Sequence, residues 1–192
     1  FCNFHRSINQ KDVYITSIEE YDKKINLLRN TGGNQLLLQG GLHPKLNIDF
    51  YTSLFSQLKD LYPDIILHAL EPPEIVHLSK LSGFSYREVL EKLHEAGLDS
   101  LPGAGAEILD NEIRKKISPG KCSADEWLEV MRQAHKLNLL TTATMMYGHI
   151  ESEEHRIAHL IKIRNLQAEK PEDSTGFISF IPWTFQYENT VL

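Results

Sequence analysis

The residues of this chain that could do chemistry are gathered in short clusters. Residues 103–106 read Gly-Ala-Gly-Ala, and the carboxylate of Glu107 follows directly. Small residues let a ligand approach the backbone closely, and a carboxylate can accept two hydrogen bonds from a diol such as a ribose. No Lys-Ser/Thr pair follows the glycines, and Ile108 stands where a third glycine would be, so the stretch is neither a Walker loop nor a dinucleotide fingerprint. A tight strand-to-helix turn with a surface glutamate is the alternative interpretation.

Four more clusters of this kind follow apolar runs elsewhere in the chain. Each brings glycine, proline, histidine or acidic residues to the place where an apolar run stops. The clusters are Gly40-Gly41-Leu42-His43-Pro44, His68 with Glu71-Pro72-Pro73-Glu74, Tyr147-Gly148-His149-Ile150-Glu151, and Pro182-Trp183.

The hydrophobic pattern predicts the elements that must position these clusters. Five short apolar runs predict strands at residues 35–39, 65–70, 98–101, 141–146 and 177–181. Helices are expected at residues 17–30, 49–61, 73–80, 85–96, 109–117, 123–137 and 152–168. Two of them begin with capping boxes, Ser17 with Glu20 and Ser123 with Glu126. Strands that alternate with helices in this way predict βα units and a parallel sheet.

Two α/β folds share this pattern, a doubly wound sheet and a (β/α) barrel. Polar residues within the strand runs, such as His68 and Thr142, suit the filled lumen of a barrel slightly better than a flat sheet covered on both faces. In either fold the ligand site lies at the carboxyl ends of the strands. The five clusters are therefore expected to meet on one rim. The run at 35–39 is expected to be a buried strand, and the last strand to end at Pro182.

The composition excludes several classes of protein. The chain is 41% hydrophobic and 24% charged, as in an ordinary globular protein. Its formal net charge of −6, without a basic block, argues against nucleic acid as the main partner. No apolar run approaches the roughly 18 residues that cross a bilayer, so no membrane insertion is expected. Only two cysteines are present, Cys2 and Cys122, which predicts a reducing cytoplasm and no disulfide framework.

The first residues give the chain a resemblance to a known family. Phe1-Cys2 looks like the aromatic residue and third cysteine of the Cys-x3-Cys-x-aromatic-Cys loop of radical S-adenosylmethionine (SAM) enzymes. The resemblance covers essentially the whole chain and is strongest to cyclic dehypoxanthinyl futalosine synthases of menaquinone biosynthesis. The segments SLPGAGAE and MMYGH are shared in part with aminofutalosine synthases and deazaflavin synthases, whereas LLQGG and the Pro-Pro-Glu run favour the cyclase. The segments that carry the resemblance are LLQGG (37–41), HALEPPEI (68–75), SLPGAGAE (100–107), ATMMYGH (143–149) and FIPW (180–183).

The resemblance implies both a fold and an activity. The fold would be a radical SAM (β/α) barrel, here a single core over residues 1–192 that is truncated at both ends and lacks its first and last strands. The activity would be that of a radical SAM cyclase, which converts dehypoxanthine futalosine to cyclic dehypoxanthinyl futalosine through a 5′-deoxyadenosyl radical. A 4Fe–4S cluster and SAM would be the cofactors, and flavodoxin or ferredoxin the electron donor. An aminofutalosine or deazaflavin synthase and a non-catalytic ligand-binding barrel fragment are the alternatives.

The resemblance also assigns roles to individual residues. Cys2 would be a ligand of the cluster, and with one cluster cysteine this segment alone is expected to be inactive. Phe1 would stack near the adenine of SAM, Gly40 and Gly41 would receive its amino group, Glu107 its ribose and Arg114 its carboxylate. A surface helix charge is the alternative interpretation of Arg114. The substrate carries a benzoate and a sugar, so it needs hydrogen-bond donors and a base. The candidates for these catalytic roles are His43, His68, Tyr147 and His149.

Two further features carry no function in this interpretation. His155 and His159 are four residues apart, but the glutamate of the HExxH zinc motif is missing between them, so a solvated helix face is expected. Cys122 is expected to be a plain thiol, because it precedes a helix cap in a connecting segment.

Overall fold

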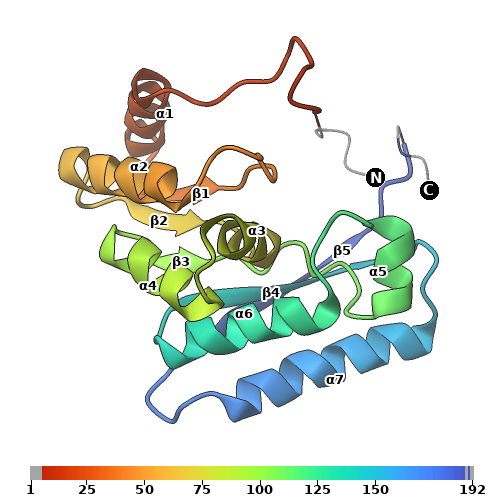
Figure 1. The fold of residues 1–192 in the computed structure, drawn as a ribbon. Coiled ribbons are helices and arrows are strands. Elements are labelled where there is room, and N and C mark those ends of the chain that lie inside the picture. Colours follow the sequence, from red (N-terminus) through yellow and green to blue (C-terminus); the bar gives the residue numbers. More distant parts are fainter. Residues whose placement is uncertain (1–5, 189, 191–192) are drawn as a thin grey trace.

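The computed structural model describes residues 6–188 and 190 of the 192-residue chain (Figure 1). The predictions for Phe1 and Cys2 lie outside the described residues. Five parallel strands form one sheet with the order β1-β2-β3-β4-β5. The strands are β1 (Gln35–Leu38), β2 (Ile66–Ala69), β3 (Ser100–Leu101), β4 (Leu140–Tyr147) and β5 (Phe177–Thr184).

The strand order decides between the two folds that the sequence pattern left open. A doubly wound sheet reverses its strand order part-way along, whereas every strand here pairs with the next one in the chain. Sequential parallel pairing is the arrangement of a (β/α) barrel. All five predicted strands are present, and the sheet is an arc of such a barrel.

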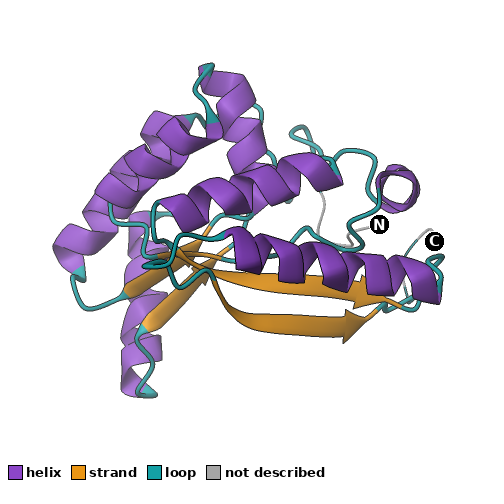
Figure 2. Ribbon diagram, turned by 90° about the horizontal axis from the view of Figure 1, so that it is seen from below, coloured by secondary structure: helices purple, strands orange, loops and turns teal. Residues whose placement is uncertain are grey.

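Seven helices accompany the strands in the described part of the chain. Figure 2 shows long helices along one face of the two longest strands, β4 and β5, while the opposite face of these strands carries none. No helix among the described residues is both long and apolar enough to cross a membrane. The helices are α1 (Ile18–Asn30), α2 (Ile48–Leu61), α3 (Pro72–Ser82), α4 (Tyr86–Glu95), α5 (Asn111–Ile117), α6 (Ala124–Lys136) and α7 (Glu153–Glu169).

Local sequence signals explain where several helices begin. Both predicted capping boxes are present: the Ser17 amide donates to Glu20 at 2.9 Å, and the Ser123 amide donates to Glu126 at 2.8 Å. A capping box satisfies backbone N–H groups that have no partner inside the helix. These contacts therefore set the first residues of α1 and α6.

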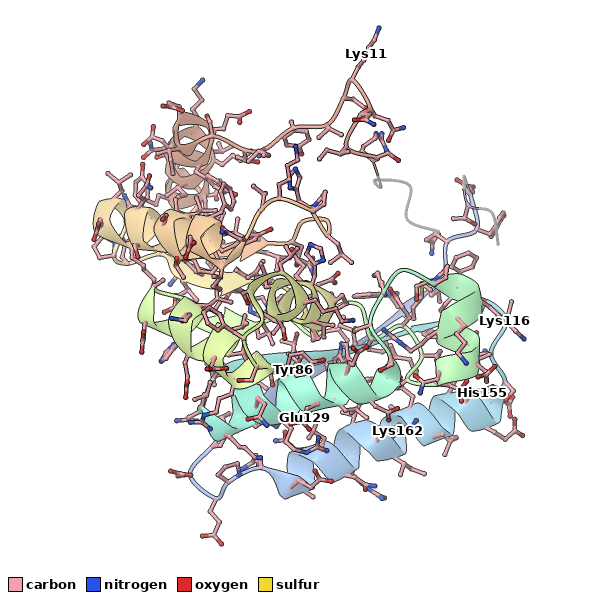
Figure 3. All side chains as sticks on the ribbon, viewed as in Figure 1. Lys11, Tyr86, Lys116, Glu129, His155 and Lys162 are labelled. Atoms are coloured by element: carbon pink, nitrogen blue, oxygen red, sulfur yellow. The ribbon has the colours of Figure 1, made fainter. Side chains whose placement is uncertain are left out.

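The hydrophobic core lies between the sheet and the helices. Trp127 of α6 is fully buried and stacks on Phe177 of β5, with 6.3 Å between ring centroids. Its indole N–H donates to the carbonyl of Ala104 at 3.1 Å, so the core holds the small-residue segment directly. The hydroxyl of Tyr86, labelled in Figure 3 at the start of α4, donates to Glu126 of α6 at 3.5 Å. The core therefore fixes the loops that follow the strands.

Two predictions about the strands are wrong. The run at 35–39 was expected to be buried, but β1 is an edge of the described sheet, and Leu37 is 55% exposed because its side chain faces the open side. The last strand was expected to end at Pro182, yet β5 continues to Thr184, with Pro182 paired opposite Met145. Proline lacks the N–H of a ladder bond, and it is tolerated here because β5 is the other edge.

The expectation of a solvated helix face at His155 and His159 is also wrong. His159 is fully buried, and its Nδ1 accepts a hydrogen bond from the Leu109 amide at 3.0 Å. Burial lowers the pKa of His159 to about 4, so the ring is neutral. His155 is half-buried at the start of α7 (Figure 3), where the Ser152 amide donates to its Nδ1 at 3.0 Å. Both histidines hold backbone groups in place.

Candidate active site at the carboxyl ends of the strands

The face of the sheet that carries no helices is hollow. Alternate side chains of the strands point into a concavity of about 720 Å³. Successive side chains of a strand point to opposite faces, so the residues beside those in the hydrophobic core line this hollow. Its lining includes Leu37, His68, Ser100, Thr142 and Trp183. The concave face therefore offers a mostly apolar space with a few polar groups, which is typical of a small-molecule site.

His68 and Ser100 form a hydrogen-bonded pair inside this concavity. They are register partners on β2 and β3, and His68 Nδ1 lies 2.7 Å from Ser100 Oγ. Both side chains are buried. Burial lowers the pKa of His68, and a hydrogen bond to the backbone of Ser100 acts against that shift. The ring is therefore neutral near pH 7 and can accept a proton.

Glu107 lies at the carboxyl end of β3, as predicted, but not on the surface. Its side chain is buried, and Lys121 Nζ donates to its Oε1 at 2.9 Å. Its backbone has φ +48°, an uncommon conformation for a residue other than glycine. The Met146 amide donates to its carbonyl oxygen at 2.9 Å, which ties this turn to β4. The alternative of a surface glutamate is wrong.

The glycines before Glu107 allow a close approach of backbone to backbone. A Cβ atom on Gly103 would lie 2.1 Å from the carbonyl oxygen of Thr142, a distance that no side chain permits. Gly105 has φ +73°, and a Cβ atom there would lie 2.5 Å from Pro73 Cγ of α3. The small residues are therefore required because the loop is packed between β4 and α3.

Arg114 of α5 is buried, so the alternative of a surface charge is wrong. Its Nε and Nη2 donate to the carbonyl of Cys122 at 2.9 and 2.6 Å, and its Nη1 donates to the carbonyl of Ala106. In this arrangement the guanidinium holds the backbone directly before Glu107. Cys122 is a buried free cysteine, and burial raises the pKa of its thiol to about 11, as expected for a plain thiol.

The loop after β1 is held by a buried acid that the sequence interpretation gave no role. The Gly40 amide donates to Glu74 Oε1 at 3.2 Å, and the Glu71 amide donates to Glu74 Oε2 at 2.9 Å. Burial and the neighbouring Glu71 carboxylate raise the pKa of Glu74 to about 8, although both amides oppose the shift. Burial also raises the pKa of Glu71, which Lys121 opposes and Glu107 reinforces. Three carboxyl groups, from the loops after β2 and β3 and from the first turn of α3, therefore interact with one lysine.

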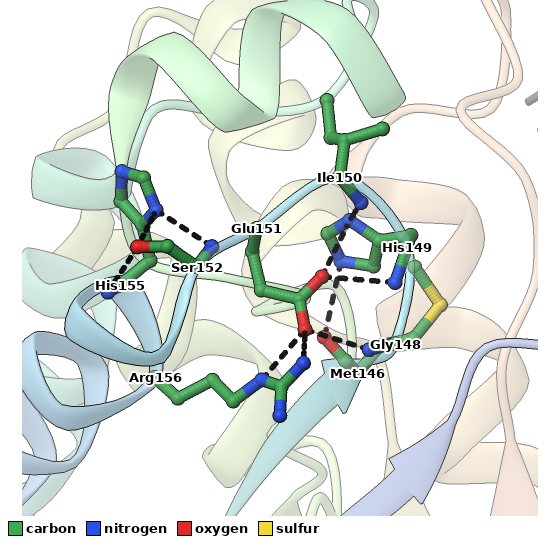
Figure 4. A network of polar contacts seen from close by, with 8 residues as sticks. All are labelled: Met146, Gly148, His149, Ile150, Glu151, Ser152, His155 and Arg156. Atoms are coloured by element: carbon green, nitrogen blue, oxygen red, sulfur yellow. Dashed lines mark hydrogen bonds and ion pairs between the residues drawn. The ribbon is translucent and has the colours of Figure 1, made fainter.

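The loop after β4 forms a separate network (Figure 4). His149 Nε2 donates to the Met146 carbonyl at 3.2 Å, and its Nδ1 accepts from the Ile150 amide at 2.8 Å and lies 3.1 Å from Glu151 Oε2. Burial alone would raise the pKa of Glu151, but hydrogen bonds from the Gly148 and His149 amides and from Arg156 lower it to about 2. Both ring nitrogens of His149 are thus engaged within their own turn.

Two other predicted catalytic residues also lie on this rim. Tyr147 is half-buried at the end of β4, and the Arg156 guanidinium lies over its ring, 5.4 Å from the centroid. His43 is half-buried in the loop after β1, where its Nδ1 accepts from the Lys45 and Leu46 amides at 3.2 Å. His68 is the candidate whose ring lines the concavity.

Comparison with known proteins decides the family. The model of the Radical SAM superfamily matches residues 1–163. The chain belongs to the radical SAM superfamily. Its five-stranded sheet is accordingly part of a radical SAM barrel. Members of this superfamily use an iron–sulfur cluster and SAM.

Radical SAM relatives with three different names are almost equally similar. The 5-amino-6-(D-ribitylamino)uracil–L-tyrosine 4-hydroxyphenyl transferase of Methanopyrus kandleri is 40% identical over 98% of this chain and 50% of the relative. The cyclic dehypoxanthine futalosine synthase of Halalkalibacterium halodurans is 41% identical over 99% of the chain and 50% of the relative. The aminodeoxyfutalosine synthase of Thermus thermophilus is 40% identical over the whole chain and 50% of the relative. The chain thus spans about half the length of these curated relatives, and similarity alone does not select one reaction.

Gly41 and Glu107, which the resemblance assigns to SAM, both lie in loops that follow strands of the rim. A Cβ atom on Gly41 would meet nothing within 4 Å, so the space beside this glycine is open to a ligand. Glu107 supplies a buried carboxylate at the end of β3. No group of three or more His, Cys, Asp or Glu side chains that could hold a metal ion lies among residues 6–188 and 190. The assignment of Cys2 to the radical SAM cluster therefore stays a prediction, as does that of Phe1 to the adenine.

Sequence reasoning missed Glu74, Lys121 and Ser100. Glu74 is the second residue of the helix predicted at 73–80, and nothing local indicates its contact with Gly40, 34 residues earlier. Lys121 lies in a connecting segment 14 residues after Glu107, so nothing local links the two. Ser100 had a signal that could have been used, because a serine and a histidine on neighbouring buried strands are candidates for a polar pair.

Proposed function

We propose that the protein containing this chain is a radical SAM cyclase that converts dehypoxanthine futalosine to cyclic dehypoxanthinyl futalosine in menaquinone biosynthesis. The observation that carries the proposal is the neutral imidazole of His68 in a hollow of about 720 Å³, a size that suits a small-molecule substrate. The cyclisation ends with the loss of one electron and one proton as the aromatic ring re-forms; the iron–sulfur cluster would supply the acceptor for the electron, and a neutral imidazole can take the proton. The name and 41% identity of the H. halodurans relative support the choice of substrate.

A second candidate is an aminofutalosine or deazaflavin synthase reaction. The relatives from T. thermophilus and M. kandleri, at 40% identity each, support it. These reactions would use the same rim but a different acceptor for the substrate radical. The choice between the candidates therefore depends on what fills the concavity.

The chain's own residues would bind and orient the reactants. When bound, the cluster and SAM supply a 5′-deoxyadenosyl radical that removes a hydrogen atom from the substrate. Gly40 and Gly41 would receive the amino acid part of SAM through the backbone, and Glu107 would accept the ribose hydroxyls. Arg114, in contact with the carbonyl before Glu107, would reach the SAM carboxylate only after leaving its present backbone partners.

The catalytic roles follow from which ring atoms and hydroxyls face the substrate. His68 would take the final proton from within the concavity. Tyr147 and His43 would donate hydrogen bonds to the substrate's carboxylate and hydroxyl groups at the rim. His149 would act by shaping the turn after β4, because both of its ring nitrogens are engaged there. The same proposal places the protein in the cytoplasm, with flavodoxin or ferredoxin as electron donor.

The decisive experiment compares substrates. The full-length protein is reconstituted with iron and sulfide without oxygen, reduced, and incubated with SAM and either dehypoxanthine futalosine or the enolpyruvyl substrate of aminofutalosine synthase. Mass spectrometry of the products is expected to show cyclisation of the first substrate. Turnover of the second substrate alone would transfer the assignment to aminofutalosine synthase. A protein that binds neither cluster nor SAM would be a non-catalytic barrel.

Glu107→Ala tests the ribose assignment separately from the chemistry. Loss of a charged hydrogen-bond acceptor should weaken SAM binding by roughly 10- to 100-fold and leave cluster assembly intact. Binding is measured by equilibrium dialysis, and assembly by iron content. Glu112→Ala is the matched control, because Glu112 is an exposed carboxylate on the adjacent helix α5. Equal SAM affinity in the two variants would remove Glu107 from the site.

A further inference from the structure

Glu74 differs from the other glutamates that occupy the third position of a helix. Like them, it accepts a hydrogen bond from the amide of the residue that caps its helix, here Glu71 at 2.9 Å. Its other carboxylate oxygen makes a contact outside the helix: it accepts from the amide of Gly40 at 3.2 Å, and Gly40 lies 34 residues earlier in the chain. The glutamates that occupy the same position in other helices are Glu20, Glu88 and Glu126.

The surroundings of Glu74 are unfavourable for a charged side chain. Glu74 is only 3% exposed, and burial is the main cause that raises its pKa. Tyr51 of α2 lies near enough that the Glu74 charge contributes to raising the tyrosine's pKa. Glu71 repels the Glu74 charge, and Lys121 stabilises it. A helix cap alone needs no buried carboxylate, because the capping glutamate of α4, Glu88, is exposed.

The hydrogen bonds of Glu74 join two loops of the rim. Gly40 belongs to the loop after β1, and Glu71 to the loop after β2. The charge of Glu71 is coupled to Lys121 and Glu107, and Glu107 lies in the loop after β3. Glu74 therefore ties the glycine loop to the start of α3, where the neighbouring Glu71 is coupled by charge to the carboxylate proposed to bind ribose.

We propose that Glu74 is a positioning residue that holds the Gly40–Gly41 loop against the start of α3, so that the loop can receive the amino acid part of SAM. This inference rests on the proposed function of the rim. Glu74 acts through Gly40 and does not itself contact SAM. The open space beside Gly41 is then kept at a fixed place relative to Glu107.

The two oxygens of the carboxyl group explain why an acid is needed, because an oxygen that carries a proton still keeps a lone pair with which to accept a hydrogen bond. One oxygen accepts from Gly40 and the other from Glu71. The side chain of glutamine offers one oxygen and one NH2 group. In Glu74→Gln one of the two backbone N–H groups would therefore face a donor instead of an acceptor. The variant keeps the shape of the side chain and breaks one specific contact.

The test uses the reconstituted full-length protein and two measurements. SAM affinity is measured by equilibrium dialysis, and hydrogen exchange at the Gly40 amide by mass spectrometry with residue resolution. Glu74→Gln should weaken SAM binding about tenfold, the equivalent of one lost hydrogen bond, and should speed exchange at Gly40. Iron content should not change. Glu88→Gln is the matched control, since Glu88 bonds its own cap residue Ser85 at 2.8 Å and should leave both measurements unchanged.

The outcomes separate this inference from the proposed function. Wild-type exchange and affinity in Glu74→Gln would overturn the positioning role. A wild-type protein that binds no SAM would overturn the proposed function, while exchange at Gly40 would still test the link. Should Glu74→Gln not fold, exchange in the wild type decides, because a Gly40 amide that exchanges as fast as an unstructured one has no acceptor in Glu74.

Discussion

Two buried glutamates on the same rim have opposite electrostatic states. Glu74, at the start of α3, has its pKa raised to about 8. Glu151, in the loop between β4 and α7, has its pKa lowered to about 2. Both side chains are buried, and both accept hydrogen bonds from two backbone amides.

The balance of causes differs between them. Burial is the main cause that raises the pKa of Glu74, and the Glu71 charge adds to it, whereas at Glu151 the amide hydrogen bonds, and after them Arg156, outweigh burial. Arg156 donates Nε and Nη2 to Glu151, at 2.8 and 2.7 Å, so the buried negative charge is neutralised in place. Glu74 has Glu71 beside it, and the nearby cation Lys121 already donates to Glu107. In the turn after β4 the carboxylate of Glu151 therefore has a cation of its own, whereas on the β1–β3 side three carboxyl groups share Lys121. Strained electrostatics of this kind cluster at functional sites, which supports placing SAM on the β1–β3 side.

The largest effect should come from removing the satisfied carboxylate. Glu151→Ala leaves the Arg156 guanidinium and two backbone amides without their acceptor, which should lower the free energy of unfolding by about 4 kcal/mol. Urea denaturation of the full-length protein measures the loss. Glu154→Ala, at an exposed carboxylate in the first turn of α7, is the control and should cost under about 1 kcal/mol. Similar losses in both variants would show that the network in Figure 4 contributes no special stability.

A smaller effect, which depends on pH, should come from Glu74. Between pH 4.5 and about 8 the folded state holds a proton on Glu74 that the unfolded state has released, so stability falls as pH rises. From pH 5 to 7.5 this proton should lower the free energy of unfolding by roughly 3 kcal/mol. Glu74→Gln removes the titrating group, and its free energy of unfolding should fall less over that range than that of the wild type. Parallel pH profiles for the two proteins would contradict the raised pKa of Glu74.

The sequence was sufficient to predict where the elements lie, because their boundaries are chemically local. The strand Gln35–Leu38 ends just before two glycines, and the capping box of Ser123 and Glu126 marks the start of α6 within four residues of sequence. The pattern alone did not choose between a barrel and a doubly wound sheet, because both repeat the same βα unit. That choice depends on strand order, which only the pairing of β1 through β5 shows.

The site was predicted in position but not in partners. Gly40 and Glu107 were placed at strand ends, and the structure has them there. Their contacts with Glu74 and Lys121 join residues 34 and 14 positions apart, and such contacts depend on how whole elements pack. His149 shows the opposite problem. A histidine after a glycine at a strand end resembles a catalytic group, yet its own turn engages both ring nitrogens.

The smallest predicted effect concerns the pair His68 and Ser100, which belongs to the β1–β3 side of the comparison. Ser100→Ala removes the hydroxyl that lies 2.7 Å from His68 Nδ1. If this hydrogen bond orients the base, its loss should raise the activation free energy by about 1 kcal/mol and lower kcat roughly fivefold. KM should stay near the wild-type value, because Ser100 acts through His68. The acid limb of the pH–rate profile should also move, since it reports the imidazole whose environment has changed. Ser100→Thr keeps a hydroxyl on the β-strand and should restore most of the rate. A profile that is identical in the wild type and Ser100→Ala would show that the proton leaves by a route that does not involve His68, and the active half of the rim would then have to be sought around Tyr147.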